Sequence, residues 1–160
     1  MEELEAKHFK CIKRDNSEEE VERRWQIFKI VFDKFYDYLK TKGINENTAG
    51  KRTDRAAFFI MNYLFVYGDA RSILDISEDT IRKFLGNWYI RRFWDPSIRG
   101  IHSYLKAISD FYAFLNERGF VSKEQLSETK AVCKDKAWFE MRLRTYFGAK
   151  GDDFYDRIQE

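Results

Sequence analysis

Two short segments of the chain carry closely spaced basic side chains that could bind phosphate. Residues 51–55 have a basic side chain at three of their five positions. Residues 99–106 combine two basic side chains with a histidine and a serine. Basic and hydroxyl side chains make most protein contacts to the DNA backbone, so both segments are candidates for a nucleic-acid interface. The predicted DNA-binding residues are Lys51, Arg52, Arg55, Arg99, His102, Ser103 and Lys106.

The second basic segment lies at the start of a strongly amphipathic stretch, residues 97–119. Its apolar residues recur at alternating spacings of three and four, as in a helix with one buried face. They are Ile98, Ile101, Leu105, Ile108, Tyr112 and Leu115. Arg99, Ser103 and Lys106 fall on the opposite side, near the N-terminal end, where free backbone amides also favour phosphate. The alternative is an ordinary solvated face, in which these cations only keep an aromatic-rich helix soluble.

Histidine and cysteine, which carry much of enzyme and metal chemistry, are scarce in this chain. There are two of each: His8, His102, Cys11 and Cys133. His8 and Cys11 have the spacing of half a zinc site, but the sequence offers no second pair of ligands. We therefore interpret His8 as a surface side chain next to a buried or half-buried thiol. Since glycine-rich phosphate loops are also missing, the sequence predicts no catalytic residue, no metal site and no cofactor.

The elements that position the basic residues follow a helical period throughout. Hydrophobic residues make up 44% of the chain and aromatic residues 18%, while a single proline and eight glycines leave few breaks. Helices are predicted over residues 17–43, 47–68, 77–92, 95–119 and 122–147, the second of them the central and most buried one. The expected N-caps are Ser17, Asn47 or Thr48, Ser77, Asp95 and Ser122. The first helix should bury a stripe formed by Val21, Trp25, Phe28, Phe32, Phe35 and Leu39.

Four segments between residues 32 and 119 share the apolar pattern of one known domain. They are residues 32–43, which stop at Gly43; residues 47–65, where Asn47-Thr48 precede an aromatic run; residues 74–85; and residues 97–119. Together they resemble the N-terminal SAM-like, or core-binding, domain of phage integrases and other tyrosine recombinases. The resemblance covers a little over half of the chain.

This resemblance implies a compact orthogonal bundle of four helices that clamps one side of a DNA duplex, with the second and fourth helices facing the DNA. The expected fold is therefore all-α, a bundle of this type plus one or two C-terminal helices. We expect an N-terminal arm or short helix over residues 1–16, the core-binding-like domain over 17–121, and a helical extension over 122–160 that departs from the family. Cleavage in the family needs a His-x-x-Arg motif, which neither histidine here begins, so no enzymatic activity is expected.

Two functions of different classes fit these observations. The first is non-catalytic binding of duplex DNA through the basic N-terminal ends of the second and fourth helices. The second is a helical interaction or dimerisation module, with an aromatic surface for a second copy of the chain or for a recombinase partner. The residues considered for that surface are Trp138, Phe139, Tyr146 and Phe154. One continuous positive face would favour DNA, and an exposed aromatic patch would favour a protein partner.

The sequence also indicates a compartment. Residues 1–5 are acidic and lack the apolar stretch of a secretory signal, and no apolar run approaches the ~20 residues of a membrane span. Two cysteines are fewer than a secreted disulfide scaffold normally carries. We therefore expect a cytoplasmic protein with reduced thiols, no membrane partner and no small-molecule substrate. Because the formal net charge is only +2, a DNA-binding face would have to come from clustering of the cations.

Overall fold

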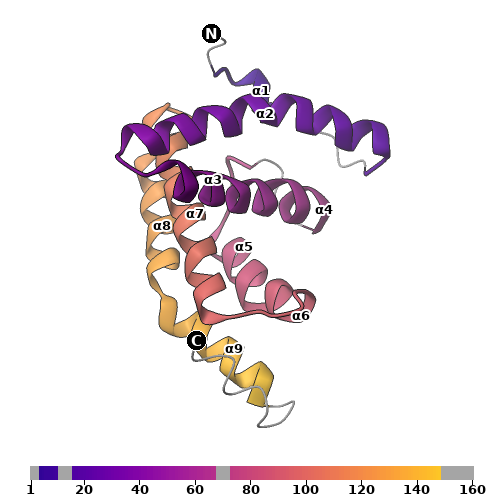
Figure 1. Ribbon diagram of the computed structural model, residues 1–160, viewed down its shortest axis with the longest axis vertical. Helices are drawn as coiled ribbons and strands as arrows, with labels where there is room; N and C mark the ends of the chain where they lie inside the picture. The colour runs from indigo at the N-terminus through magenta and orange to yellow at the C-terminus, as the bar shows by residue number, and fades with distance from the viewer. Residues whose placement is uncertain (1–3, 11–15, 68–72, 149–160) are drawn as a thin grey trace.

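The computed structural model describes residues 4–10, 16–67 and 73–148, and every regular element within these ranges is a helix (Figure 1). The all-α prediction is therefore confirmed. The elements are α1 (Lys7–Lys10), α2 (Glu18–Thr41), α3 (Glu46–Ala57), η1 (Phe58–Leu64), α4 (Phe65–Tyr67), α5 (Glu78–Lys83), η2 (Phe84–Trp88), α6 (Tyr89–Arg92), α7 (Ile98–Glu117), α8 (Lys123–Lys134) and α9 (Lys136–Gly148). Elements α3, η1 and α4 form one continuous rod with a π-helical middle section, and α5, η2 and α6 form another.

The N-caps explain where the long helices begin. Ser17, Ser77 and Ser122 cap α2, α5 and α8 as predicted, each accepting a backbone N–H three residues ahead. The other two predicted caps were wrong. Asn45, not Asn47 or Thr48, caps α3, and Ser97, not Asp95, caps α7.

The packing of the helices is that of an orthogonal bundle. In Figure 1, α2 and the α3–α4 rod run across the view, whereas α7 and α8 run down it. Helix α7 packs against α2, α3, α8 and α9, so α7 is the central helix rather than the predicted 47–68 helix. The predicted 122–147 helix is in fact two, because the chain leaves the helical conformation at Asp135 (φ −79°, ψ 57°). Both parts pack on the bundle, α8 against α5 and α7, and α9 against η2 and α7.

Aromatic rings fill the core, as the composition predicts. Phe35 of α2 contacts Phe111 and Phe114 of α7 with ring centroids 5.2 and 5.6 Å apart. The predicted apolar stripe of α7 is buried apart from the half-buried Ile98, and Tyr104, Phe111 and Phe114 are buried beside it. This broad apolar surface, rather than a single stripe, is what places α7 at the centre.

The stripe of α2 starts differently from the prediction. Trp25 is 41% exposed, and the buried side chain in that turn is Arg24, whose guanidinium lies 5.0 Å from the ring of Phe65. Phe28, Phe32, Phe35 and Leu39 are buried as expected. A long arginine can bury its aliphatic stem and stack its flat head on an aromatic ring, which the apolar period cannot show.

The N-terminal segment docks onto the bundle as a short helix. Phe9 of α1 is buried, and its ring lies 6.2 Å from that of Phe28 and 4.7 Å from that of Phe120. His8, expected at the surface, is buried, with its Nδ1 at hydrogen-bond distance from the backbone of Glu5. Its predicted neighbour Cys11 lies outside the described residues.

Candidate nucleic-acid interface

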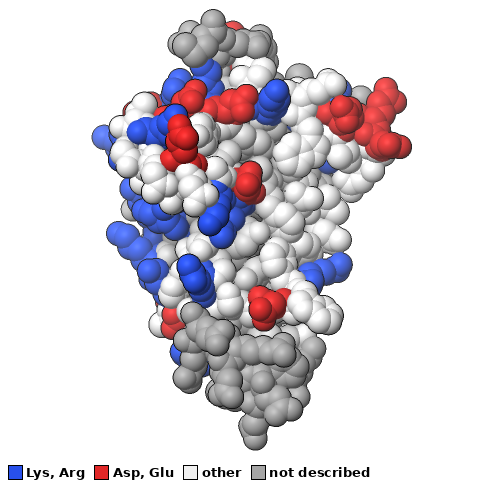
Figure 2. Space-filling view, viewed as in Figure 1, with Lys and Arg blue, Asp and Glu red and all other residues white. Residues whose placement is uncertain are grey.

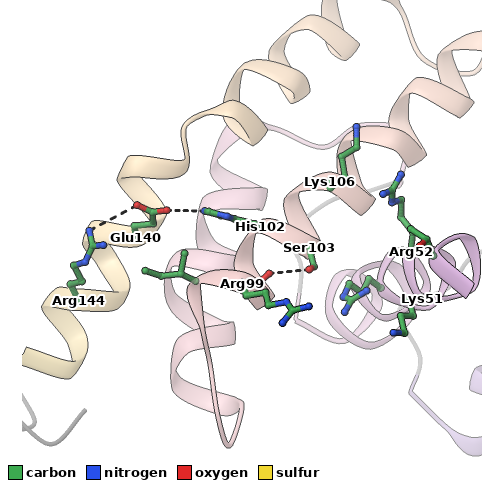
Figure 3. A pocket seen from close by; sticks show the side chains of 11 residues that line it. Lys51, Arg52, Arg99, His102, Ser103, Lys106, Glu140 and Arg144 are labelled. Carbon is green, nitrogen blue, oxygen red and sulfur yellow. Dashed lines mark hydrogen bonds and ion pairs between the residues drawn. The ribbon is translucent and has the colours of Figure 1, made fainter. Parts of the chain in front are cut away.

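All seven residues predicted to bind DNA line one groove of about 740 Å³ between α3 and α7. Figure 3 shows Lys51 and Arg52 entering from α3, and Arg99, His102, Ser103 and Lys106 from α7. The remaining lining residues are Thr48, Ile98, Glu140 and Arg144, and the last two come from α9, which forms the far wall. Two basic segments far apart in the sequence therefore become one site.

Three cations in this groove stand apart from the ion pairs and hydrogen bonds of the described residues. The side chains of Lys51, Arg55 and Arg99 form no ion pair or hydrogen bond with any described residue. Lys51 and Arg99 are exposed, and Arg55 is half-buried. Arg55 lies near two phenols, Tyr89 and Tyr104, whose pKa values are raised by burial, that of Tyr104 to about 12. Because these phenols are neutral at pH 7, they do not neutralise the guanidinium.

Arg52 and Lys106, in contrast, share a carboxylate. Arg52 Nη1 lies 2.7 Å from Asp110 Oδ2, and Lys106 Nζ lies 3.3 Å from Asp110 Oδ1. Arg52 and Asp110 are mostly buried, with side-chain exposures of 17% and 19%. The Arg52–Asp110 pair links α3 to α7, so its main role is to hold the two walls of the groove together, and the trio contributes one net positive charge.

The wall on α9 adds a polar cluster that the sequence did not predict. His102 Nε2 lies 2.8 Å from Glu140 Oε1, and Arg144 Nη1 lies 3.9 Å from Glu140 Oε2 (Figure 3). Glu140 and Arg144 are one helical turn apart on α9, but nothing in the sequence says that this turn lies against α7. Glu140 engages His102, which is therefore less available to phosphate than the three free cations.

A close approach between helices places α9 at the groove. An added Cβ at Gly86 would lie 2.5 Å from the ring of Trp138, so only glycine lets this indole rest on η2. Arg142 Nε then donates to the carbonyl oxygen of Gly86 at 3.1 Å. From α5, Arg82 stacks on the indole of Trp138 at 4.6 Å and pairs with Asp135 at 3.0 Å.

The start of α7, which carries Arg99, is held by a second close approach. The backbone N–H of Ser97 donates to the hydroxyl of Tyr89 at 3.3 Å, and the N–H of Gly100 donates to Ser97 Oγ at 2.9 Å. Ser103 Oγ donates to the carbonyl oxygen of Arg99 at 2.9 Å, so this hydroxyl can only accept from a ligand. The basic residues of α3 begin a full turn after its first residue, so a free helix N-terminus supports only the α7 part of the predicted interface.

Glycine substitutions test this packing. Gly100→Ala should destabilise the protein by about 1–3 kcal/mol, because the new Cβ would lie 2.1 Å from the Tyr89 hydroxyl oxygen. Gly50→Ala, in α3, is the matched control and should stabilise the protein by about 0.5–1 kcal/mol, since nothing lies within 4 Å of its Cβ. Denaturant unfolding measures both. Equal stabilisation by the two substitutions would contradict the assigned contact.

The aromatic surface considered for a protein partner is not formed by the described residues. Phe139 is fully buried, and Trp138 and Tyr146 are half-buried against the core. Phe154 lies outside the described residues. Figure 2 shows Lys and Arg along the side where α3, α7 and α8 lie, with acidic side chains among them towards α2, and the acidic first turn of α2 lies at the opposite edge. Charge, not aromatic surface, is therefore the prominent feature beside the groove.

The described residues contain no group of three or more metal-ligating side chains, and Cys133 is a free, buried thiol. None of the helices in the described ranges has the length and apolar character needed to cross a bilayer.

Comparisons of the chain with protein-family models, with curated proteins and with solved structures find no match.

Proposed function

We propose that this protein binds duplex DNA through the phosphate backbone without cleaving it, as a non-catalytic relative of the recombinase core-binding domain. The observation that carries the proposal is the groove, which Lys51, Arg55 and Arg99 line without an acidic partner among the described residues. Cations that line one groove repel each other, and a polyanion relieves that repulsion while releasing its own counterions. A cytoplasmic location, where DNA is present and the Cys133 thiol stays reduced, belongs to the same proposal.

The contacts favour backbone binding over base reading. The ammonium of Lys51 and the guanidinium groups of Arg55 and Arg99 can all donate charged hydrogen bonds to phosphate oxygens. Among the other polar side chains of the groove, Arg52 and Glu140 are engaged with Asp110 and with His102 and are not free to contact base edges. We therefore expect binding with little dependence on DNA sequence.

The alternative, a helical interaction or dimerisation module, has weaker support. Its predicted aromatic surface is largely buried among the described residues. The experiment below distinguishes the two functions, since the absence of DNA binding would favour the interaction module.

A fluorescence-anisotropy titration with random duplex DNA at two salt concentrations tests the proposal. We expect a Kd of about 10⁻⁴ to 10⁻⁶ M at physiological salt, and a fall in affinity with salt of log–log slope near −3 for about three phosphate contacts. Supercoiled plasmid incubated with the protein should stay uncut, because the His-x-x-Arg motif is missing. Absence of binding even at low salt would exclude DNA binding and leave the interaction module.

A further inference from the structure

Trp94 is the most exposed large hydrophobic side chain among the described residues. Its exposed fraction is 98%, against 47% for Tyr67 and Met141, the next in order. The indole makes no ring contact with any described residue. Tryptophan normally buries a large area on folding, so a fully solvated indole is a surface available for a ligand.

The loop that carries Trp94 is held at both ends. Phe93 packs on the aromatic cluster, with its ring 4.4 Å from that of Tyr89 and 5.5 Å from that of Phe58. Pro96 is buried, and Ser97 is the N-cap of α7. Trp94 is therefore presented by a short loop between two fixed points, which lowers the entropy lost when the indole binds.

Trp94 also lies close to the groove and in a basic environment. It precedes Ile98, a groove residue, by four positions, so their Cα atoms are at most about 14 Å apart, roughly four base steps of DNA. The nearest exposed charges along the chain are Arg91, Arg92 and Arg99, with Asp95 as the one acid. A protein-binding hot spot is normally ringed by residues that exclude water, whereas three cations and one acid lie within five residues of this indole along the chain, a balance that suits a polyanion.

We propose that Trp94 stacks on an unpaired base of a nucleic acid whose backbone occupies the groove. This inference rests on the proposed function and deepens it: the preferred ligand is DNA with a single-stranded extension at the end of the duplex. The cations of α3 and α7 hold phosphates, and the indole takes the first base that is free of pairing. Every base has a π-face, so such stacking selects for unpaired structure and not for sequence.

The test compares a blunt duplex with the same duplex carrying a few unpaired nucleotides on one strand. The parent protein should bind the extended duplex more tightly. Trp94→Ala should weaken binding to the extended duplex about 5- to 150-fold and leave binding to the blunt duplex nearly unchanged. Trp94→Phe should keep most of the affinity, because a phenyl ring also stacks.

Trp25→Ala is the matched control, since Trp25 is a partly exposed tryptophan on α2, an element that does not line the groove. It should bind both DNAs like the parent. Both Trp94 variants should fold normally, because the side chain makes almost no contact with the protein. If Trp94→Ala and the parent bind the extended duplex equally, the stacking proposal is wrong while the groove proposal stands. If the parent binds neither DNA, both proposals are wrong.

Discussion

Replacing Lys51, Arg55 and Arg99 together with alanine is expected to weaken duplex binding about 100-fold at physiological salt and to flatten the log–log salt slope by about 3. Each phosphate contact releases close to one counterion, so three lost contacts remove nearly three units of slope. The three side chains are chosen because no described residue pairs with them. Arg52 and Lys106 are left in place because they hold Asp110, and removing them would disturb the α3–α7 contact.

The matched control carries the same change of charge elsewhere. Lys123, Lys130 and Lys134 of α8 are exposed, form no ion pair with a described residue and do not line the groove. Their triple alanine variant should keep nearly the parent affinity and slope. Anisotropy titrations at several salt concentrations measure both variants, with circular dichroism to verify folding. Equal losses in the two variants would mean that net charge, not the groove, attracts DNA, and no loss in either would exclude the groove as the site.

Much of this site could be predicted because local spacing determines which side chains share a helix face. Lys51 and Arg55 are four residues apart, as are Arg99 and Ser103, so each pair projects from one side of its helix. The apolar stripe of α7 then fixes which side of that helix faces the core. Placing the two basic faces beside each other needed only the packing of α3 on α7. The family resemblance implied that both helices face DNA, which is consistent with that packing.

The pairings inside the groove depend on long-range packing and could not be predicted. Glu140 reaches His102 only because α9 folds back over η2, and that depends on an indole fitting over Gly86. Asp110 belongs to the same helix as Lys106, yet its closer partner is Arg52 of α3. No periodicity in the sequence reports on either contact.

The solvent exposure of individual side chains was also predicted wrongly from the apolar pattern. Trp25 fits the apolar stripe of α2 but is partly exposed, while Arg24 beside it is buried. Trp94 lies in a loop, and a helical period does not predict the burial of loop residues. A tryptophan is read as core by default, and only the placement of its neighbours shows when it is not.

The stability of the protein should fall steeply at alkaline pH. Burial raises the pKa of the Cys133 thiol from 9.0 to about 12, and it also raises the pKa of the fully buried Tyr112 hydroxyl well above 10.0. The Tyr112 hydroxyl donates to the carbonyl oxygen of Ile73, a bond that requires its proton. In this pH range the folded state keeps protons that the unfolded chain has lost, so the free energy of unfolding decreases as pH rises.

For Cys133 alone the expected loss is about 1.4 kcal/mol for each pH unit, or about 4 kcal/mol between pH 9.0 and about 12. Cys133→Ala removes this group, so its free energy of unfolding should start slightly lower at neutral pH but decline less steeply above pH 9.0. Denaturant unfolding of parent and variant across this range measures the two slopes. The remaining slope of the variant reports the buried tyrosines, since each phenolate formed on unfolding contributes in the same direction. Parallel curves for parent and variant would show that the thiol ionises in the folded protein as readily as in water, contrary to its burial on the inner face of α8.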